Sequence, residues 1–336
     1  MRLRLLADDL TGALDSAAAF AGDVPVFLDA PGATEAPVSA VATATRDVPP
    51  ATLPALLAPA RAWLREADLA FKKVDSLLRG NTFAECAALA ADYRRVVFAP
   101  AFPRQGRVTV DGRAWVRQPG ASALVPIVGT ALAGGFAGVA VPSLWVPEVR
   151  DDADLLRIAR LSLQPEARGW LWCGSAGLAH ALAEVHGRAA GHALPPASPG
   201  PVLLVSASHH AVVRRQWARL QSHGGADLDL RCVDLSAPGR LDPEAAAAAL
   251  AAQTQALVEG SARPGTLVVI GGDTLRALCR AAGTDALLAR AAPRPGWGQA
   301  QLVGGRWDGL RCHSRSGAFG SDDDLVETLR AIACAS

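Results

Sequence analysis

Residues 3–13 read Leu-Arg-Leu-Leu-Ala-Asp-Asp-Leu-Thr-Gly-Ala, and this stretch decides the class of fold. Leu3–Ala7 is a short, mostly apolar run typical of a buried strand, and Thr11–Ala21 has the Ala-rich, amphipathic composition of a helix. The same order of strand and helix recurs through residues 24–99. Such alternation predicts an α/β fold with a largely parallel sheet and helices on its faces.

The rest of the first half follows the same pattern. We predict further strands at Val24–Leu28, Val38–Thr43, Leu69–Val74, Arg95–Ala99 and Trp170–Cys173. We predict helices at Leu53–Arg65, Arg79–Asp92, Asp152–Leu163 and Ala176–Val185. Residues 103–150 have weaker periodicity and are predicted to be irregular or short-stranded.

A linker is predicted at Gly187–Pro201, which holds four prolines and three glycines and has no apolar period. Beyond it the alternation restarts. We predict strands at Val202–Val205, Leu228–Val233, Thr266–Ile270 and Ala300–Val303, and helices at Ala211–Ser222, Pro243–Val258, Thr274–Ala282 and from about Asp322. The chain is therefore expected to form two α/β domains, residues 1–190 and residues 200–336.

Composition excludes several classes of partner. The 33 basic and 32 acidic residues leave a net charge of +1, which gives no electrostatic basis for binding nucleic acid or a membrane surface. No apolar run is long enough to span a membrane, and Asp8 and Asp9 interrupt any signal-peptide core. The six cysteines are dispersed, without metal-ligand spacing. We expect a cytoplasmic protein with reduced cysteines, and the sequence leaves open whether it forms a homo-oligomer.

Lysine is scarce in this chain. Two of the 33 basic residues are lysines, Lys72 and Lys73, and they are adjacent. Either they have no special role in an Arg-rich composition, or the chemistry of the protein requires lysine at these positions. Their segment is therefore a candidate site.

Asp8 and Asp9 directly follow the first predicted strand. In open α/β sheets ligands gather at the carboxyl ends of strands, so these two carboxylates are placed to act on one. The alternative is that one acid caps the following helix. A haloacid-dehalogenase-type phosphatase also opens on a strand followed by aspartates, but it needs them two residues apart, whereas adjacent side chains diverge on an extended chain.

The second candidate is the stretch at residues 71–81, Phe-Lys-Lys-Val-Asp-Ser-Leu-Leu-Arg-Gly-Asn. Strand alternation places Lys73 and Asp75 on one face and Lys72 on the other. Its polar residues offer cations for an anionic ligand and a carboxylate that could accept a hydroxyl proton: Lys73, Asp75, Ser76, Arg79 and Asn81. A surface salt bridge is the alternative interpretation.

Small residues between a strand and a helix leave backbone N–H groups available for an anion. Gly174 and Ser175 occupy such a junction in the first half, where they could equally serve close packing. Ser208 lies at a second junction, where it could cap the helix or bond a phosphate. Gly271–Thr274 and Arg315–Asp322 form two more, and three such junctions in the second half suggest a nucleotide site.

Together these segments resemble the four-carbon acid sugar kinase family. Residues 7–13, Ala-Asp-Asp-Leu-Thr-Gly-Ala, resemble its opening motif, and residues 73–81 resemble its Lys-x-Asp-Ser-Thr-Leu-Arg-Gly-Asn motif. Residues 100–107, 174–179, 271–274 and 316–320 are similar to further family signatures. The segments occur in the family's order over nearly the whole chain.

The resemblance implies an ATP-dependent kinase whose two domains face each other across a cleft, the first holding the sugar acid and the second the nucleotide. The implied nucleotide contacts are Ser208, Gly271, Gly272, Asp273, Thr274 and Gly317. The implied substrates are threonate, erythronate, 3-oxo-tetronate and related branched acids.

For the phosphoryl transfer itself we expect Mg²⁺ with the triphosphate, although no metal ligand can be assigned. Lys73 and Arg79 would bind the substrate carboxylate or the transferring phosphate. Either Asp9 or Asp75 would orient the attacking hydroxyl and accept its proton. The expected substrate-binding residues are Asp8, Ser76, Asn81, Gly174 and Ser175.

Three positions depart from the family pattern. Leu77 stands where the family has Thr, Ala207 where it has Gly, and Arg315 where it often has Lys. An Arg cannot replace a compact ammonium at a tight contact. These changes keep a second hypothesis open, a catalytically silent sensor that binds a sugar acid or nucleotide.

For the two lysines, we expect Lys73→Ala to lose activity and Lys72→Arg to have little effect.

Overall fold

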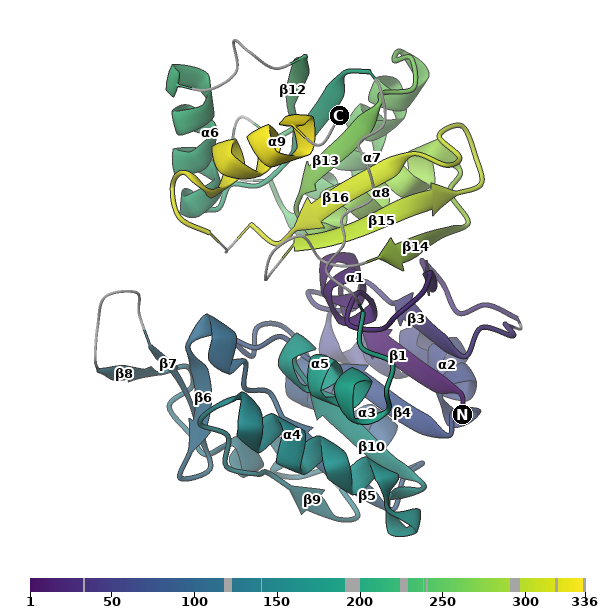
Figure 1. The fold of residues 1–336 in the computed structure, drawn as a ribbon, viewed down its shortest axis with the longest axis vertical. Coiled ribbons are helices and arrows are strands. Elements are labelled where there is room, and N and C mark those ends of the chain that lie inside the picture. Colours follow the sequence, from purple (N-terminus) through teal and green to yellow (C-terminus); the bar gives the residue numbers. More distant parts are fainter. Residues whose placement is uncertain are drawn as a thin grey trace. The chain divides into compact units, whose positions relative to one another are not determined.

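The structure is a computed structural model that describes residues 1–32, 34–117, 123–139, 141–190, 200–223, 229–237, 239, 241–290, 297–317 and 320–334. The chain divides into two compact units, Met1–Gly191 and His192–Ser336, called here the first and second unit (Figure 1). Much of the linker predicted at Gly187–Pro201 lies outside the described residues.

The first unit is built on a sheet whose described strand pairs are all parallel. Its strands, in spatial order, are β2 (Val24–Phe27), β3 (Val38–Ala42), β1 (Leu3–Ala7), β4 (Leu69–Lys73), β10 (Trp170–Gly174), β5 (Arg95–Ala99) and β9 (Leu144–Trp145). Ala7 at the end of β1 lies opposite both Ala42 and Lys73. The carboxyl ends of the central strands are therefore level, and the loops beyond them meet at one edge.

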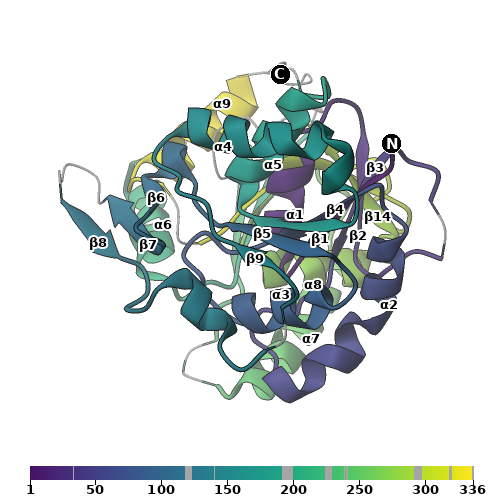
Figure 2. The same cartoon turned by 90° about the horizontal axis from the view of Figure 1, so that it is seen from below.

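Helices cover both faces of this sheet. They are α1 (Leu10–Ala17), α2 (Leu53–Arg65), α3 (Thr82–Ala90), α4 (Asp152–Arg160) and α5 (Ala176–Val185), with short 3₁₀ turns η1 (Pro50–Thr52), η2 (Pro103–Gln105), η3 (Leu132–Phe136), η4 (Leu161–Leu163) and η5 (Pro165–Ala167). Helix α5 packs against α1 and α4 on one face, and α2 packs against α3 on the other (Figure 2). The central strands read as apolar runs because both faces are covered.

Residues 107–117 and 124–126 contribute the strands of a separate small antiparallel sheet. Its strands are β6 (Arg107–Val110), β7 (Arg113–Arg117) and β8 (Leu124–Pro126), in that order. Residues 103–150 were expected to be irregular or short-stranded, and the described part of the segment agrees with that expectation.

The second unit has a mixed sheet. Its strands, in spatial order, are β12 (Leu230–Asp234), β11 (Val202–Ser206), β13 (Thr266–Ile270), β16 (Arg311–Arg315), β15 (Trp297–Val303) and β14 (Ala286–Arg290). The first four are parallel, and β15 runs antiparallel to both neighbours. Helices α6 (Ala211–His223) and α9 (Asp324–Cys334) contact each other, as do α7 (Pro243–Glu259) and α8 (Gly272–Ala282).

Two strands of this unit were missed from sequence. Strand β14 is a short Ala/Leu run that periodicity alone cannot distinguish from a buried helix. Strand β16 reads Arg-Cys-His-Ser-Arg, so it lacks the apolar signal of a strand, yet its last four residues are buried. Among the described residues, no helix has the length and apolar character that a bilayer span requires.

Candidate functional site

The carboxyl edge of the first sheet carries a cluster of charged side chains from the loops after β1, β3 and β4. It is called the charged cluster and consists of Asp8, Asp9, Arg46, Lys73, Asp75 and Arg79. The three carboxylates and Lys73 are buried, each less than 10% exposed. Ionised groups with so little contact with water need partners of opposite charge, and the cluster supplies them internally.

Arg46 joins the two adjacent aspartates. Its Nε lies 2.8 Å from Asp8 Oδ2, and its Nη2 contacts Asp9 Oδ2. Asp9 also caps α1, because its Oδ1 accepts hydrogen bonds from Gly12 N at 2.5 Å and Thr11 Oγ1 at 2.8 Å. Both interpretations of this motif therefore apply to Asp9: it caps the helix and it belongs to the charged cluster.

The same guanidinium influences the protonation of Asp8. Burial alone would raise the pKa of the Asp8 carboxyl, but Arg46, Lys72 and Lys73 outweigh it, and the pKa is lowered. Asp8 is therefore ionised at neutral pH. Arg46 was missed at the sequence level because it belongs to no motif; its only signal is its place a few residues beyond a predicted strand.

Lys73 ends β4 and reaches toward the start of α1. Its Nζ donates to the Val74 carbonyl at 3.0 Å. A Cβ added to Gly12 would lie 3.0 Å from this Nζ, so the absence of a side chain at Gly12 leaves room for the ammonium. Burial lowers the pKa of Lys73, against the opposing influence of Asp8 and Asp75. This is the environment of a cation placed for a ligand rather than of a solvated surface lysine.

Asp75 organises the turn between β4 and α3. It accepts a hydrogen bond from Leu77 N at 2.8 Å and a forked contact from Arg79, with Nη2 at 2.5 Å and Nε at 3.1 Å. Arg46 Nη2 lies 3.5 Å away. Burial opposes these interactions, but the two guanidiniums and Lys73 hold the pKa of Asp75 well below its ordinary value. Asp75 is thus a weak base and a strong acceptor.

This turn also explains why α3 begins at Thr82 instead of the predicted Arg79. Leu78 and Gly80 both have positive φ, which no helix allows. At Gly80 a Cβ would lie 2.4 Å from the Arg46 carbonyl oxygen, so only glycine lets the two loops touch. Asn81 Nδ2 donates to the carbonyls of Thr45 and Val48 at 2.9 and 2.7 Å, which holds the Arg46 loop in place. A substrate contact for Asn81 stays a prediction.

Arg107 lies beside the charged cluster and was also missed as a site residue. It is buried, and its Nη1 donates to Ser76 Oγ at 2.5 Å and to Gln105 Oε1 at 2.8 Å. Burial lowers its pKa to about 10, so it stays cationic at neutral pH. The Gly106-Arg107 pair was noted in the family resemblance, but the sequence offered no reason to give it a role.

Asp15 is the third residue that sequence reasoning missed. It lies on α1 one turn beyond Gly12, on the same helix face. Burial raises its pKa to about 6, against the opposing influence of Lys73 and Arg107. Asp15 therefore adds a carboxyl with a raised pKa next to this cluster.

Gly174 and Ser175 have clear structural roles. Ser175 caps α5: its Oγ accepts from Gly177 N at 3.1 Å and donates to the Ala101 carbonyl at 2.5 Å. A Cβ on Gly174 would lie 2.6 Å from Leu178 Cδ2, so this glycine permits close packing of strand and helix. Their predicted contacts with substrate stay predictions.

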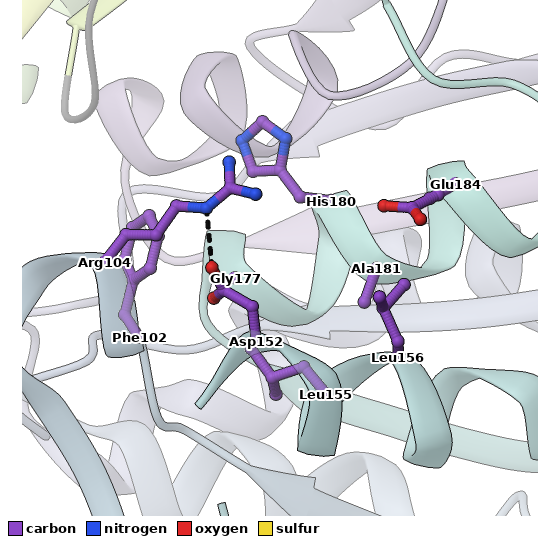
Figure 3. A pocket seen from close by; sticks show the side chains of 9 residues that line it. All are labelled: Phe102, Arg104, Asp152, Leu155, Leu156, Gly177, His180, Ala181 and Glu184. Atoms are coloured by element: carbon purple, nitrogen blue, oxygen red, sulfur yellow. Dashed lines mark hydrogen bonds and ion pairs between the residues drawn. The ribbon is translucent and has the colours of Figure 1, made fainter. Parts of the chain in front are cut away.

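A small cavity opens near the start of α5 (Figure 3). Its lining includes Phe102, Leu155 and His180, and the Arg104–Asp152 ion pair closes one side at 2.8 Å. Its volume of about 30 Å³ is close to that of a single water molecule in the liquid. It is therefore too small for a sugar acid.

The carboxyl edge of the second sheet has a different character. Ser206, Ile270 and Arg315 end three neighbouring parallel strands in register. The loops beyond them hold the junctions predicted from sequence, and "glycine-rich edge" here means residues 206–210, 271–274 and 315–317. The rest of the final predicted loop, Ala318 and Phe319, lies outside the described residues.

The absence of a side chain matters at two glycines on this edge. Gly271 has φ +111°, a conformation open to glycine, and donates its N–H to the Arg315 carbonyl at 2.9 Å. A Cβ on Gly317 would lie 2.8 Å from Ser208 Oγ, so these two predicted nucleotide contacts are neighbours. Gly272, Asp273 and Thr274 form the first turn of α8, whose N-terminal amides suit an anion.

Arg315 does not take the place of a phosphate-binding lysine. Its side chain is fully buried, contacts Gln216 Oε1 and lies 3.6 Å from Asp324 Oδ2. The guanidinium stacks 5.2 Å from the Trp297 ring centre. Burial lowers its pKa to about 10, against the opposing influence of Asp324. This departure from the family pattern is thus a fold-stabilising side chain that points into the second unit.

The residues present are compatible with a magnesium nucleotide as a substrate. Among the described residues, no group of three or more His, Cys, Asp or Glu side chains could hold a metal by itself. Mg²⁺ bound to a nucleotide needs few protein ligands, because it keeps waters and the phosphates themselves. The glycine-rich edge offers the cradle that such phosphates require.

Fold and site together define a two-unit α/β protein with a charged edge in one unit and a glycine-rich edge in the other. A family model described as "Sugar-binding N-terminal domain" matches residues 3–134. The chain is 30% identical to a D-threonate kinase of Cupriavidus necator, over 98% of this chain and 97% of that protein. The chain therefore belongs to the four-carbon acid sugar kinase family.

Similarities to two further proteins agree with this family and with its fold. A D-threonate kinase of Bordetella bronchiseptica is 28% identical over 98% of this chain and 96% of its own. The solved structure of a Haemophilus influenzae protein of the family DUF1537 superposes with a TM-score of 0.66 at 18% identity, covering 98% of this chain and 99% of that one. At that identity the likeness shows the fold alone.

Proposed function

We propose that this protein is an ATP-dependent kinase that phosphorylates the terminal hydroxyl of a four-carbon acid sugar, with D-threonate as the first candidate. The observation that carries the proposal is the charged cluster, in which buried carboxylates and cations meet at the carboxyl edge of the first sheet. The full-length similarity to two D-threonate kinases supports the choice of substrate.

The first unit would bind the sugar acid. Lys73 and Arg79 supply positive charge for the substrate carboxylate and for the transferring phosphate, and buried Arg107 adds a third cation next to Ser76. A negative substrate is favoured at such a place because Lys73 and Arg107 are already desolvated by the fold, whereas Arg79 is partly exposed.

The attacking hydroxyl needs an acceptor for its proton. Of the two carboxylates considered from sequence, Asp75 is already engaged by the forked contact of Arg79 and by Leu77 N, in addition to Arg46. We therefore assign the orienting role to Asp9. Phosphoryl transfer depends mainly on positioning and charge neutralisation, so a carboxylate that is held still by Arg46 and the α1 amides is suited to it.

The second unit would bind the nucleotide. Backbone N–H groups of Gly272–Thr274 and Gly317, with the Ser208 hydroxyl, would hold the phosphates of MgATP, and Gly271 would leave room for them. The magnesium ion neutralises charge on the phosphates when it is bound.

The test is ADP release measured with a panel of four-carbon acids: both enantiomers of threonate and erythronate, 3-oxo-tetronate and branched analogues. We expect one of them to stimulate turnover strongly over the rate with ATP alone, and Asp9→Asn to abolish that stimulation. Calorimetric binding without turnover would instead support a sensor. Hydrolysis of phosphate esters without any use of ATP would support a phosphatase.

A further inference from the structure

Beneath the charged cluster lies a second, fully buried pair of charges. Lys72, the other lysine of the chain, is 1% exposed, and Glu85 on α3 is 0% exposed. Lys72 Nζ lies 2.6 Å from Glu85 Oε2 and donates to the Lys73 carbonyl at 3.0 Å. These contacts argue against the expectation that Lys72→Arg has little effect, because a larger guanidinium would have to fit a fully buried place shaped to an ammonium.

The contribution of this ion pair to folding stability does not by itself explain why the chain contains it. Removing two charges from water is costly, and well-packed apolar residues of similar volume often stabilise a core as well or better. The pair also sits among side chains of low polarity, including Cys86 on α3 and Cys173 on β10. A role outside simple packing would account for its presence.

The pair is positioned to influence the site in two ways. The carbonyl that Lys72 holds belongs to Lys73, the last residue of β4, whose side chain and following turn enter the charged cluster. The ammonium also interacts electrostatically with Asp8 at the end of the neighbouring strand. Lys72 thus bonds the backbone at the end of β4 and interacts electrostatically with Asp8. Lys73 lies on the opposite face of the strand, toward the charged cluster.

We propose that Lys72 is a positioning residue of the sugar-acid site: held by Glu85, it bonds the Lys73 carbonyl and so fixes the end of β4, from which the charged cluster begins. This inference rests on the proposed kinase function. The charged and titratable groups around Lys72 are Asp8 from the loop after β1, Glu85 and Cys86 from α3, and Cys173 from β10. Asp8 in turn interacts with Arg46 from the loop after β3 and with Lys73 from β4.

The protonation of the pair fits this role. Burial alone would lower the pKa of Lys72, but Glu85 and Asp8 outweigh it and raise the pKa. The ammonium therefore stays charged throughout the neutral range. Its charge is among those that keep the pKa of Asp8 below its ordinary value.

The test compares Lys72→Met with the double variant K72M/E85L in the full chain. The single variant leaves a buried carboxylate unpaired and should lose thermal stability, whereas the double variant removes both charges and should regain it. If Lys72 positions the site, kcat falls on the order of 10²-fold in both variants. The acid limb of the kcat/KM profile should also shift up by about one pH unit in both, because Asp8 loses a neighbouring cation.

Leu89→Ala is the matched control. Leu89 is buried one turn beyond Glu85 on α3, so this change weakens the same helix without touching the pair. It should lower the melting temperature and leave kcat and the acid limb unchanged. A double variant that regains wild-type kcat and the wild-type acid limb together with its stability would overturn the proposal.

Lys72→Gln covers the case in which the apolar variants do not fold. The amide keeps a hydrogen-bond donor for the Lys73 carbonyl but carries no charge, so the acid limb should still shift; an unshifted limb with wild-type kcat contradicts the proposal. If the wild-type chain phosphorylates no acid, the proposed function fails separately. Lys72 is then tested by a carboxyl NMR titration of Asp8, whose pKa should rise in Lys72→Gln; an unchanged pKa contradicts the inference.

Discussion

The carboxyl edge of the first sheet is built from charged side chains, whereas the carboxyl edge of the second is built from glycines, hydroxyls and backbone amides. In the first, Arg46 alone contacts three carboxylates. In the second, the Arg315 side chain points away from the edge into the interior. Two sheets of similar layout can therefore favour an anion in different ways. The first uses fixed positive charges, and the second uses backbone amides that only small residues leave accessible.

The largest expected effect tests the fixed charge directly. Lys73→Ala removes the buried ammonium next to Gly12 and Asp75, and we expect kcat/KM for the sugar acid to fall on the order of 10³-fold, since a preorganised charge at the reacting groups is lost. The variant should stay folded, as judged by its circular dichroism and cooperative melting. Near-normal turnover would remove Lys73 from the site.

The second prediction concerns the stability of the charged cluster. Arg46→Met leaves Asp8, Asp9 and Asp75 without their shared guanidinium, and we expect unfolding to become easier by about 3 kcal/mol at pH 7. The pKa values of Asp8 and Asp75 are lowered in the folded protein, so their stabilisation is present above the ordinary pKa and is lost as pH falls.

The difference between Arg46→Met and wild type should therefore shrink below about pH 4. Urea unfolding at about pH 2.5 and at pH 7 measures it. Arg104→Met, which breaks an exposed ion pair with Asp152, is the control and should change stability little at either pH. An equal loss at both pH values would show that Arg46 acts by packing alone.

The third prediction tests the cradle of the second unit. A methyl group at Gly317 would lie 2.8 Å from Ser208 Oγ, so Gly317→Ala should raise the KM for ATP about 10-fold, corresponding to about 1.4 kcal/mol. The KM for the sugar acid should stay unchanged. Gly239→Ala is the matched control, because no atom lies within 4 Å of its added Cβ. If both KM values rise together in Gly317→Ala, the two edges do not divide the substrates between them.

The smallest effect is expected at Asp15. Its pKa is raised from 3.8 to about 6 in the folded protein, so between these values the unfolded chain releases its proton first and stability falls as pH rises. Asp15→Asn should stabilise the protein by ~1 kcal/mol above pH 6 and not at all below pH 4. Urea unfolding across pH 4–8 measures the difference. Stabilisation that is independent of pH would contradict the shifted carboxyl.

Local sequence predicted most of the strands and helices of the first unit because each motif is read within a few residues. Leu3–Ala7 and Leu53–Arg65 were predicted with the bounds that the structure gives them. Strand β16 could not be found in this way, because its polar side chains are buried, and the partners of Arg315 lie on other elements, α6, α9 and β15. A pattern of hydrophobicity carries no information on such distant partners.

The residues of the candidate site divide in the same way, into those that local sequence predicted and those that only the structure revealed. Asp8, Asp9, Lys73, Asp75 and Arg79 lie in motifs that immediately follow strands, so the sequence alone identified them. Arg46, Arg107 and Asp15 became visible only when parallel strands brought separate loops to one edge. Lys72 illustrates both cases. Alternation along β4 predicted that its side chain faces away from that of Lys73, but only the packing of α3 revealed Glu85 as its partner. Local order fixes which way a side chain points, whereas tertiary contacts determine the charge it meets there.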